Sequence, residues 1–275
     1  MATGRGVQLE WAIVYESLSR ADVEYSTLQE RMNKYPNLKP YDGDIGRQAR
    51  DAVDLVQRKN ANLLSTAKHS DELGIKGDPE PKTDIVFTDR ITKYNCSVKM
   101  RGPVQLSSAE GPSTAKALEQ TAKYCPGERG KKLALIINRI AAAPTKLLTE
   151  RNLPKATERR PNIVADLVDS RGQIKKDKNF DIWIANHKPK LIKDLYEYLK
   201  KDPVFLQCLI GETLTGGNYF KNNKPAIATH MLSPTTFVAM DSKYAAAMVK
   251  KTKIDIRAKS RDGISSISFR FDVKA

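Results

Sequence analysis

The sequence predicts a mixed α/β protein of the α+β type, in which a central mixed β-sheet is flanked by helices. Three observations support this fold class: helical periodicity in much of the first 70 residues, a hairpin pattern at residues 82–100, and extended segments after residue 225. A chain of 275 residues can bury a substantial core, as one large domain or as two small ones.

In the first part of the chain, helix signals alternate with breaker segments. Residues 7–20 predict a helix with apolar residues on one side, and residues 33–46 predict a loop rich in Pro, Gly and Asn. A long helix is expected at residues 45–69, with Asp44 as its cap. Residues 74–81 are rich in Gly and Pro, so they end the helical region before the hairpin.

The second part of the chain combines further helices with late strands. Helices are expected at residues 112–124, 129–148, 188–201, 204–214 and 242–250, and strands at 226–232, 235–240, 254–259 and 265–273. We expect these late strands to extend the central sheet. Residues 149–182 are the most polar part and predict a mobile or inserted segment. The predicted organisation is a core with the N-terminal helices and hairpin at 1–125, a basic helical region at 126–210 and sheet-completing strands at 211–275, which can form one continuous domain.

The net positive charge of the chain arises entirely in its second part. The net charge is +15; residues 1–120 hold 17 basic and 17 acidic residues, whereas residues 121–275 hold 30 and 15. A one-sided basic surface attracts polyanions, so we expect DNA as a partner; the alternative is a lysine-rich surface that serves solubility. The candidate DNA contacts are basic pairs and an alternating strand: Lys131, Lys132, Arg159, Arg160, Lys175, Lys176, Lys253, Arg257, Lys259 and Arg261.

Composition argues against several other classes of protein. No apolar run approaches the roughly 20 residues that span a bilayer, so no membrane partner is expected. The three cysteines have no metal-ligand spacing and favour a reducing cytoplasmic compartment, where they serve as small packing residues. The three histidines lie far apart, which disfavours a zinc site, and no phosphate-binding loop for ATP is present.

The hairpin at residues 82–105 carries the clearest sign of chemistry. Asp84 lies on its first strand, while Ser97 and Lys99 lie two apart on the second strand and therefore share a face. Across an antiparallel pair, Asp84 can lie within a few ångströms of that face. An acid beside a lysine suits metal-dependent phosphodiester hydrolysis, because Mg²⁺ prefers a few carboxylates plus water. The alternative is the exposed polar face of an ordinary hairpin.

The segments Thr83-Asp84-Ile85, Ser97-Val98-Lys99 and Gln105-Leu106 resemble, in order and spacing, the motif of the PD-(D/E)xK nuclease superfamily, in particular its bacteriophage-encoded, restriction-endonuclease-like members. Residues 211–220 look like a further element of such phage proteins. The resemblance implies a restriction-endonuclease-like core with a helical insertion. It also implies a Mg²⁺- or Mn²⁺-dependent endonuclease that cleaves DNA in the host cytoplasm. Cleavage of both strands would require a homodimer or two sequential nicks.

The same resemblance assigns roles within the hairpin. It implies that Asp84 is the principal metal ligand, that Lys99 orients the attacking water, and that Gln105 supports the site. The backbone carbonyl of Val98 is also expected to face the metal. Ser97 stands where the family usually has an acid.

Serine is a poor ligand for Mg²⁺, so a second carboxylate is expected from elsewhere in the chain. Glu16 on the first helix is the favoured candidate for catalysis and metal binding, and Glu212 is the second. Asp51, Asp54 and Glu110 remain open alternatives. Ser97 also motivates a competing hypothesis, in which the chain is a catalytically inactive nucleic-acid-binding protein, or a phage structural protein, on a nuclease-like scaffold.

Overall fold

The computed structural model describes residues 4–75, 81–100, 104–110, 201–218, 220–258 and 267–273, together with residues 123, 131, 132, 135, 193, 197 and 199. For residues 104–110, 252–258 and 267–273, the description covers the backbone alone. The chain divides into two compact units. The first comprises residues 1–104 and 211–247, and the second comprises residues 105–210 and 248–274.

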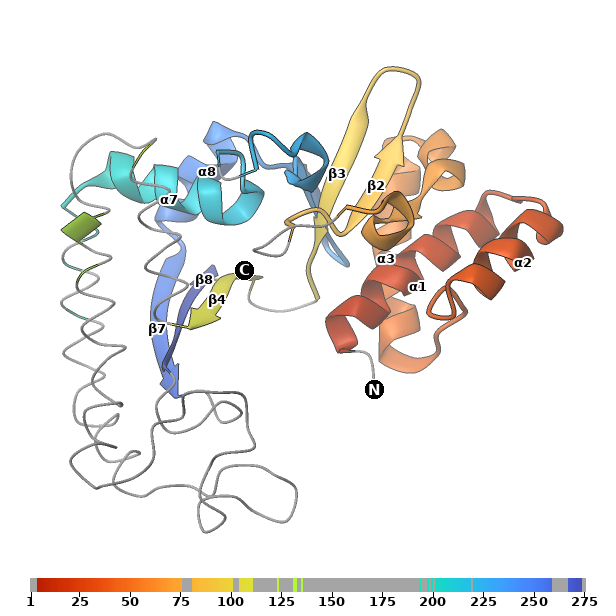
Figure 1. Ribbon diagram of the computed structural model, residues 1–275, viewed down its shortest axis with the longest axis horizontal. Coiled ribbons are helices and arrows are strands. Elements are labelled where there is room, and N and C mark those ends of the chain that lie inside the picture. The colour runs from red at the N-terminus through yellow and green to blue at the C-terminus, as the bar shows by residue number, and fades with distance from the viewer. Residues whose placement is uncertain are drawn as a thin grey trace, which may run out of the picture. The chain divides into compact units, whose positions relative to one another are not determined.

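The first unit begins with three helices, α1 (Arg5–Arg20), α2 (Tyr25–Lys34) and α3 (Gly43–Lys59) (Figure 1). Helices α1 and α3 pack against each other through apolar side chains, among them Leu9 and Ile13 of α1 and Val53 of α3. The helix predicted at residues 7–20 is confirmed, whereas α2 was not predicted. Helix α3 ends earlier than predicted, because Asn60 is extended and caps the 3₁₀ helix η1 (Ala61–Thr66). Its N-cap is Asp42, not Asp44.

A five-stranded mixed sheet confirms the predicted α+β class. Its strand order is β1 (Lys68–His69), β2 (Ile85–Thr88), β3 (Lys93–Val98), β5 (His230–Ser233) and β6 (Thr236–Ala239). Strands β3 and β5 are parallel, and the other neighbouring pairs are antiparallel. Ile85, Phe87, Cys96 and Val98 of the β2–β3 hairpin join the core formed with α1 and α3. The central sheet therefore holds the two strands that carry the predicted chemistry.

The last two strands do not extend this sheet, so that prediction is wrong for them. Strands β4 (Val104–Glu110), β7 (Thr252–Ala258) and β8 (Ile267–Val273) form a separate sheet with the order β4-β8-β7. Strands β5 and β6 do lie in the central sheet. Helix α8 (Ser242–Val249) lies between β6 and β7 in the chain. Helix α7 (Pro203–Thr215) and the short helix η4 (Lys224–Ala226) lie between β4 and β5, and the short helix η2 (Ser70–Leu73) lies between β1 and β2.

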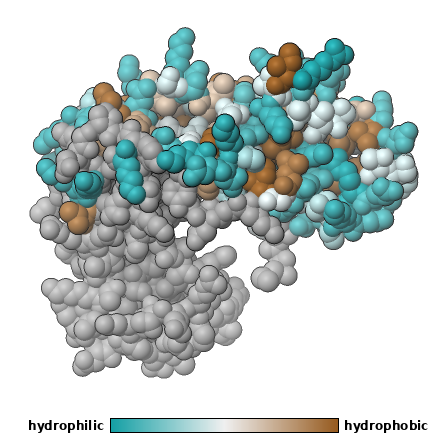
Figure 2. Space-filling model, turned by 45° about the horizontal axis from the view of Figure 1, so that its top comes forward, coloured by the Kyte–Doolittle hydropathy of each residue, from teal (hydrophilic) through white to brown (hydrophobic). Residues whose placement is uncertain are grey.

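Several other sequence predictions concern the rest of the chain. The helix predicted at residues 112–124 and the polar segment at 149–182 lie almost wholly outside the described residues. None of the helices that the structure describes is long and apolar enough to cross a membrane. On the face shown in Figure 2, the described residues are mostly hydrophilic, with smaller hydrophobic areas between them. Cys96 is a buried free thiol, but Cys208 is disulfide-bonded, which differs from the expectation that the cysteines serve as small packing residues in a reducing compartment.

Candidate active site

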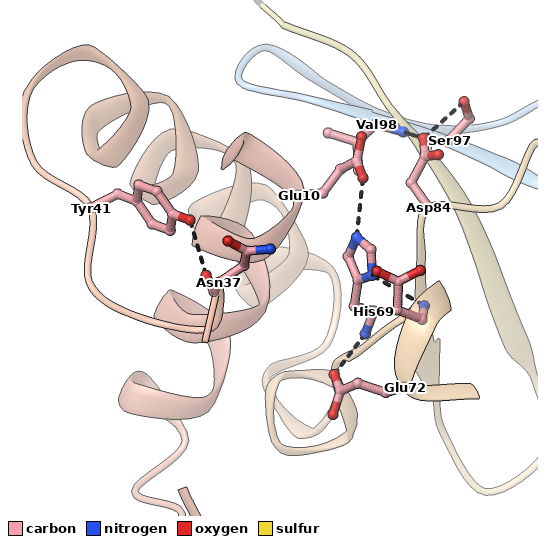
Figure 3. Close-up of polar contacts among 9 residues, drawn as sticks. Glu10, Asn37, Tyr41, His69, Glu72, Asp84, Ser97 and Val98 are labelled. Carbon is pink, nitrogen blue, oxygen red and sulfur yellow. Dashed lines mark hydrogen bonds and ion pairs between the residues drawn. The ribbon is translucent and has the colours of Figure 1, made fainter. Parts of the chain in front are cut away.

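Asp84 is held where β2 begins, by backbone hydrogen bonds on both sides of the chain. Its N–H donates to the carbonyl of Cys96 at 2.8 Å, and its carbonyl accepts from the N–H of Ser70 at 2.9 Å. The carboxylate turns toward the end of β3, where Oδ2 accepts the backbone N–H of Val98 at 2.7 Å (Figure 3). Val98 thus contacts Asp84 through its N–H; the ligand role of its carbonyl stays a prediction.

Ser97 and Lys99 lie beside Asp84, as the hairpin spacing predicted. The Ser97 hydroxyl is 3.4 Å from Asp84 Oδ2, and Lys99 Nζ donates to the same hydroxyl at 2.8 Å. The backbone of Lys99 is held by the neighbouring strand, since its N–H donates to the carbonyl of Leu232 at 2.8 Å. The buried serine therefore connects the carboxylate and the ammonium group, although it supplies no charge of its own.

The carboxylate that α1 brings to Asp84 is Glu10, not the predicted Glu16. The negative charge of Glu10 acts on Asp84 and raises its pKa. Glu16 lies six residues further along α1, which places it about 120° away around the helix. There it accepts a hydrogen bond from Arg20 at 2.8 Å, within an ion pair. Glu16 is therefore part of a different cluster.

Asp84 resists ionisation in the absence of a metal. Two effects raise the pKa of Asp84 to about 7: burial of the carboxylate away from water is the larger, and repulsion from Glu10 is the second. The positive charge of Lys99 and the N–H of Val98 oppose this shift without cancelling it. Two carboxylates that repel each other in this way form a site that favours a cation.

His69, which the sequence did not indicate, holds Glu10 from the other side. Its Nε2 lies 3.1 Å from Glu10 Oε2, and its ring stacks on Trp11 with the ring centroids 4.0 Å apart. The Glu10 carboxylate thus lies next to both His69 and the Asp84 region (Figure 3). One signal for Glu10 was present in the sequence: it is the only charged residue in the apolar run at residues 9–14.

Glu212, the second predicted source of a carboxylate, contacts the backbone at the end of α7. Its two oxygens accept the backbone N–H of Asn218 at 3.1 and 2.9 Å, where α7 turns into the following loop. Gly216 has a φ of +66°, and a Cβ there would lie 2.6 Å from a ring carbon of Phe220. Glu212 therefore holds the turn at the end of α7, and its role as a metal ligand stays a prediction.

The remaining candidate residues are placed only in part. Gln105 lies on β4, and Lys253 and Arg257 lie on β7, but their side chains are outside the described part of the structure. Lys131 and Lys132 are exposed. The other predicted contacts and the alternative ligand concern residues whose side chains are outside the described part of the structure: Arg159, Arg160, Lys175, Lys176, Lys259, Arg261 and Glu110. The alternative ligand Asp54 forms an ion pair with Arg20.

The donor set near Asp84 fits a hard divalent cation. Within the described residues, no group of three or more His, Cys, Asp and Glu side chains is arranged to hold a metal ion. Mg²⁺ nevertheless needs few protein ligands, because it keeps several waters and is held by one or two carboxylates. Asp84 and Glu10 are two such carboxylates, and their mutual repulsion would be relieved by a cation.

No protein family, curated protein or solved structure matches this chain in comparisons of its sequence and fold. Inference about function therefore rests on the geometry and electrostatics of the residues around Asp84.

Proposed function

We propose that this protein is a Mg²⁺-dependent endonuclease, also served by Mn²⁺, that hydrolyses phosphodiester bonds in DNA. The observation that carries the proposal is the convergence of two carboxylates, Asp84 from the hairpin and Glu10 from α1, beside the ammonium group of Lys99. The motif resemblance around Asp84 and Lys99 supports the same function and a restriction-endonuclease-like core.

Each residue of the site has a distinct part in this proposal. Asp84 and Glu10 would hold the cation, which would supply charge neutralisation at the phosphate and a more acidic water. Lys99 would donate a hydrogen bond to the attacking water or to a phosphate oxygen. Ser97 would keep Lys99 in place, because its hydroxyl accepts from Lys99 Nζ at 2.8 Å. A serine in place of the usual acid is then compatible with catalysis, since Glu10 provides the second carboxylate.

The basic second part of the chain is proposed to bind the DNA backbone. Its excess of Lys and Arg would neutralise phosphates and release counterions, so binding should weaken as salt increases. One site per chain cleaves one strand at a time. Cleavage of both strands would need a homodimer or two sequential nicks, and a cytoplasmic location agrees with a DNA substrate.

Cleavage of a supercoiled plasmid tests the proposed activity. We expect nicked and then linear DNA with Mg²⁺ or Mn²⁺ and no cleavage with EDTA. Asp84→Ala and Lys99→Ala should each reduce the rate by about 100-fold or more, because each removes a group that acts on the metal or the water. Arg5→Ala is a suitable control, since Arg5 is an exposed partner of Asp44. Wild-type rates in both site variants would contradict the proposal.

Two observations favour a second function, in which the chain binds nucleic acid without cleaving it. Ser97 replaces an acid, and the described residues include no cluster of three metal-binding side chains. An inactive protein of this kind, or a phage structural protein, would bind DNA in a salt-dependent manner. Titration of Mg²⁺ and Mn²⁺ in the plasmid assay separates these functions, because only the endonuclease responds to the metal.

A further inference from the structure

His69, the last residue of β1, is buried, and both of its ring nitrogens have partners. Nδ1 accepts the backbone N–H of Asp71 at 3.1 Å, and the exposed carboxylate of Asp71 lies 3.4 Å from the same nitrogen. A nitrogen that accepts a hydrogen bond carries no proton, so the proton of the neutral ring is on Nε2. Nε2–H therefore donates to Glu10 Oε2, 3.1 Å away.

The orientation of the His69 ring is fixed by its surroundings. The ring is 4% exposed and stacks on Trp11, the residue after Glu10, with 15° between the two planes. The backbone N–H of His69 donates to Glu72 Oε1 at 2.9 Å. Glu72 in turn accepts two hydrogen bonds from Arg31 of α2, at 2.9 and 2.8 Å. The imidazole thus presents one N–H to Glu10 from a rigid support.

We propose that His69 is a positioning residue that holds Glu10 ready to bind the catalytic metal, an inference that rests on the proposed function. A hydrogen bond from Nε2–H fixes one carboxylate oxygen of Glu10 and leaves Oε1 for the cation. Partners of this kind, which hold a metal-binding side chain without touching the metal, commonly change metal affinity by about 10–100-fold. His69 is not itself a metal ligand, because Nδ1 and Nε2 are both engaged.

Two substitutions separate this role from simple support of the fold. In His69→Asn, the amide oxygen can replace Nδ1 as the acceptor for Asp71, but no donor reaches Glu10. In His69→Gln, the amide N–H can replace Nε2–H as the donor to Glu10, but the acceptor for Asp71 is lost. The two variants therefore remove different hydrogen bonds from the same buried position.

Calorimetric titration with Mn²⁺ alone, together with thermal unfolding in EDTA, provides the test. We expect His69→Asn to bind Mn²⁺ at least about tenfold more weakly than wild type, and His69→Gln to bind within about threefold of wild type. Equal affinity in all three proteins overturns the inference. An equal loss in both variants, in step with their loss of thermal stability, also overturns it, since only packing would then matter. A wild-type protein that binds no Mn²⁺ overturns the proposed function itself.

A second measurement uses the unaltered protein and needs no metal. Nitrogen-15 NMR of the histidine rings should show His69 protonated at Nε2 and unprotonated at Nδ1. Glu10→Gln should shift the Nε2 signal of His69 and leave that of His230 unchanged, since His230 lies in a separate aromatic cluster with Tyr94 and Phe237. A ring protonated at Nδ1 overturns the inference whether or not the variants fold.

Discussion

Two acidic clusters each include a glutamate of α1, and they differ in whether a cation bonds directly to the carboxylates. At the end of α1, Glu16 and the α3 residue Asp54 share the guanidinium group of Arg20. Near the start of α1, burial and the negative charge of Glu10 raise the pKa of Asp84, and the positive charge of Lys99 opposes this shift only in part. In the first cluster, which we call balanced, the cation bonds directly to both carboxylates and joins two helices. In the second, which we call uncompensated, Lys99 Nζ donates to the Ser97 hydroxyl instead, and a bound cation would relieve the repulsion between the two carboxylates.

Replacing each of the two α1 glutamates in turn should produce the largest difference in cleavage activity between the two clusters. Glu10→Gln removes a proposed metal ligand and should reduce plasmid cleavage by about 100-fold or more, whereas Glu16→Gln should stay within about twofold of wild type. Initial rates of nicking in Mg²⁺ provide the measurement. The comparison would fail if Glu16→Gln lost activity and Glu10→Gln kept it, because the second carboxylate would then come from the balanced cluster.

The uncompensated cluster should also cost stability in the absence of metal. The pKa of Asp84 is raised to about 7 from an ordinary value near 3.8. The folded protein therefore holds this proton more tightly than the unfolded chain, and Asp84 lowers stability progressively as pH rises from about 4 to about 7. At pH 8 in EDTA, Asp84→Asn should raise the free energy of unfolding by about 1–3 kcal/mol. This range is smaller than the full pKa shift would imply, because Asp84 is partly exposed to water.

Urea unfolding at pH 4 and pH 8 measures this effect. The increase in the free energy of unfolding caused by Asp84→Asn should be present at pH 8 and nearly absent at pH 4. Asp89→Asn on the same hairpin is the control, because hydrogen bonds from the N–H groups of Ile91 and Thr92 lower the pKa of Asp89, and its replacement should bring no gain. An equal gain at both pH values would show that charge is not the cause.

A smaller effect should follow from loss of the serine between Asp84 and Lys99. Ser97→Ala leaves Lys99 Nζ without the acceptor at 2.8 Å and should reduce cleavage by about tenfold, because the ammonium group is less well placed. The affinity for Mn²⁺ should remain within about twofold of wild type. A large loss of Mn²⁺ affinity would instead indicate that Ser97 binds the metal directly.

The smallest effect is expected in the balanced cluster. Arg20 is 25% exposed and pairs with Glu16 and Asp54, which are 23% and 50% exposed. Arg20→Met keeps much of the apolar stem and should lower the free energy of unfolding by about 0.5–1 kcal/mol, less at high salt. Cleavage by the folded variant should equal that of wild type. A loss of activity would mean that this cluster also supports the site.

The sequence predicted the parts of the site that depend on local spacing. Asp84, Ser97 and Lys99 lie on one hairpin, where the period of two and antiparallel pairing determine which side chains meet. Glu10 could not be chosen over Glu16 in this way, because both lie on a predictable helix and only its packing decides which one faces the hairpin.

Long-range pairing explains the other differences. Strands β7 and β8 have the same extended pattern as β5 and β6, yet they join a separate sheet with β4. The pattern of a strand predicts its conformation but not its neighbour. The contact of Glu212 with the N–H of Asn218 was missed for a related reason, because the spacing of acids alone does not reveal such a local use.

The parallel pairing of β3 with β5 has a consequence for the order in which the protein is made. Lys99 is anchored to Leu232, a residue 133 positions later in the chain, and Asn95 is bonded to Thr229 over a similar interval. A growing chain that has not yet reached β5 lacks this anchor, however well its hairpin has formed. The lysine can be fixed in place only after residue 232 has been synthesised, so a growing chain that stops before it lacks a finished site.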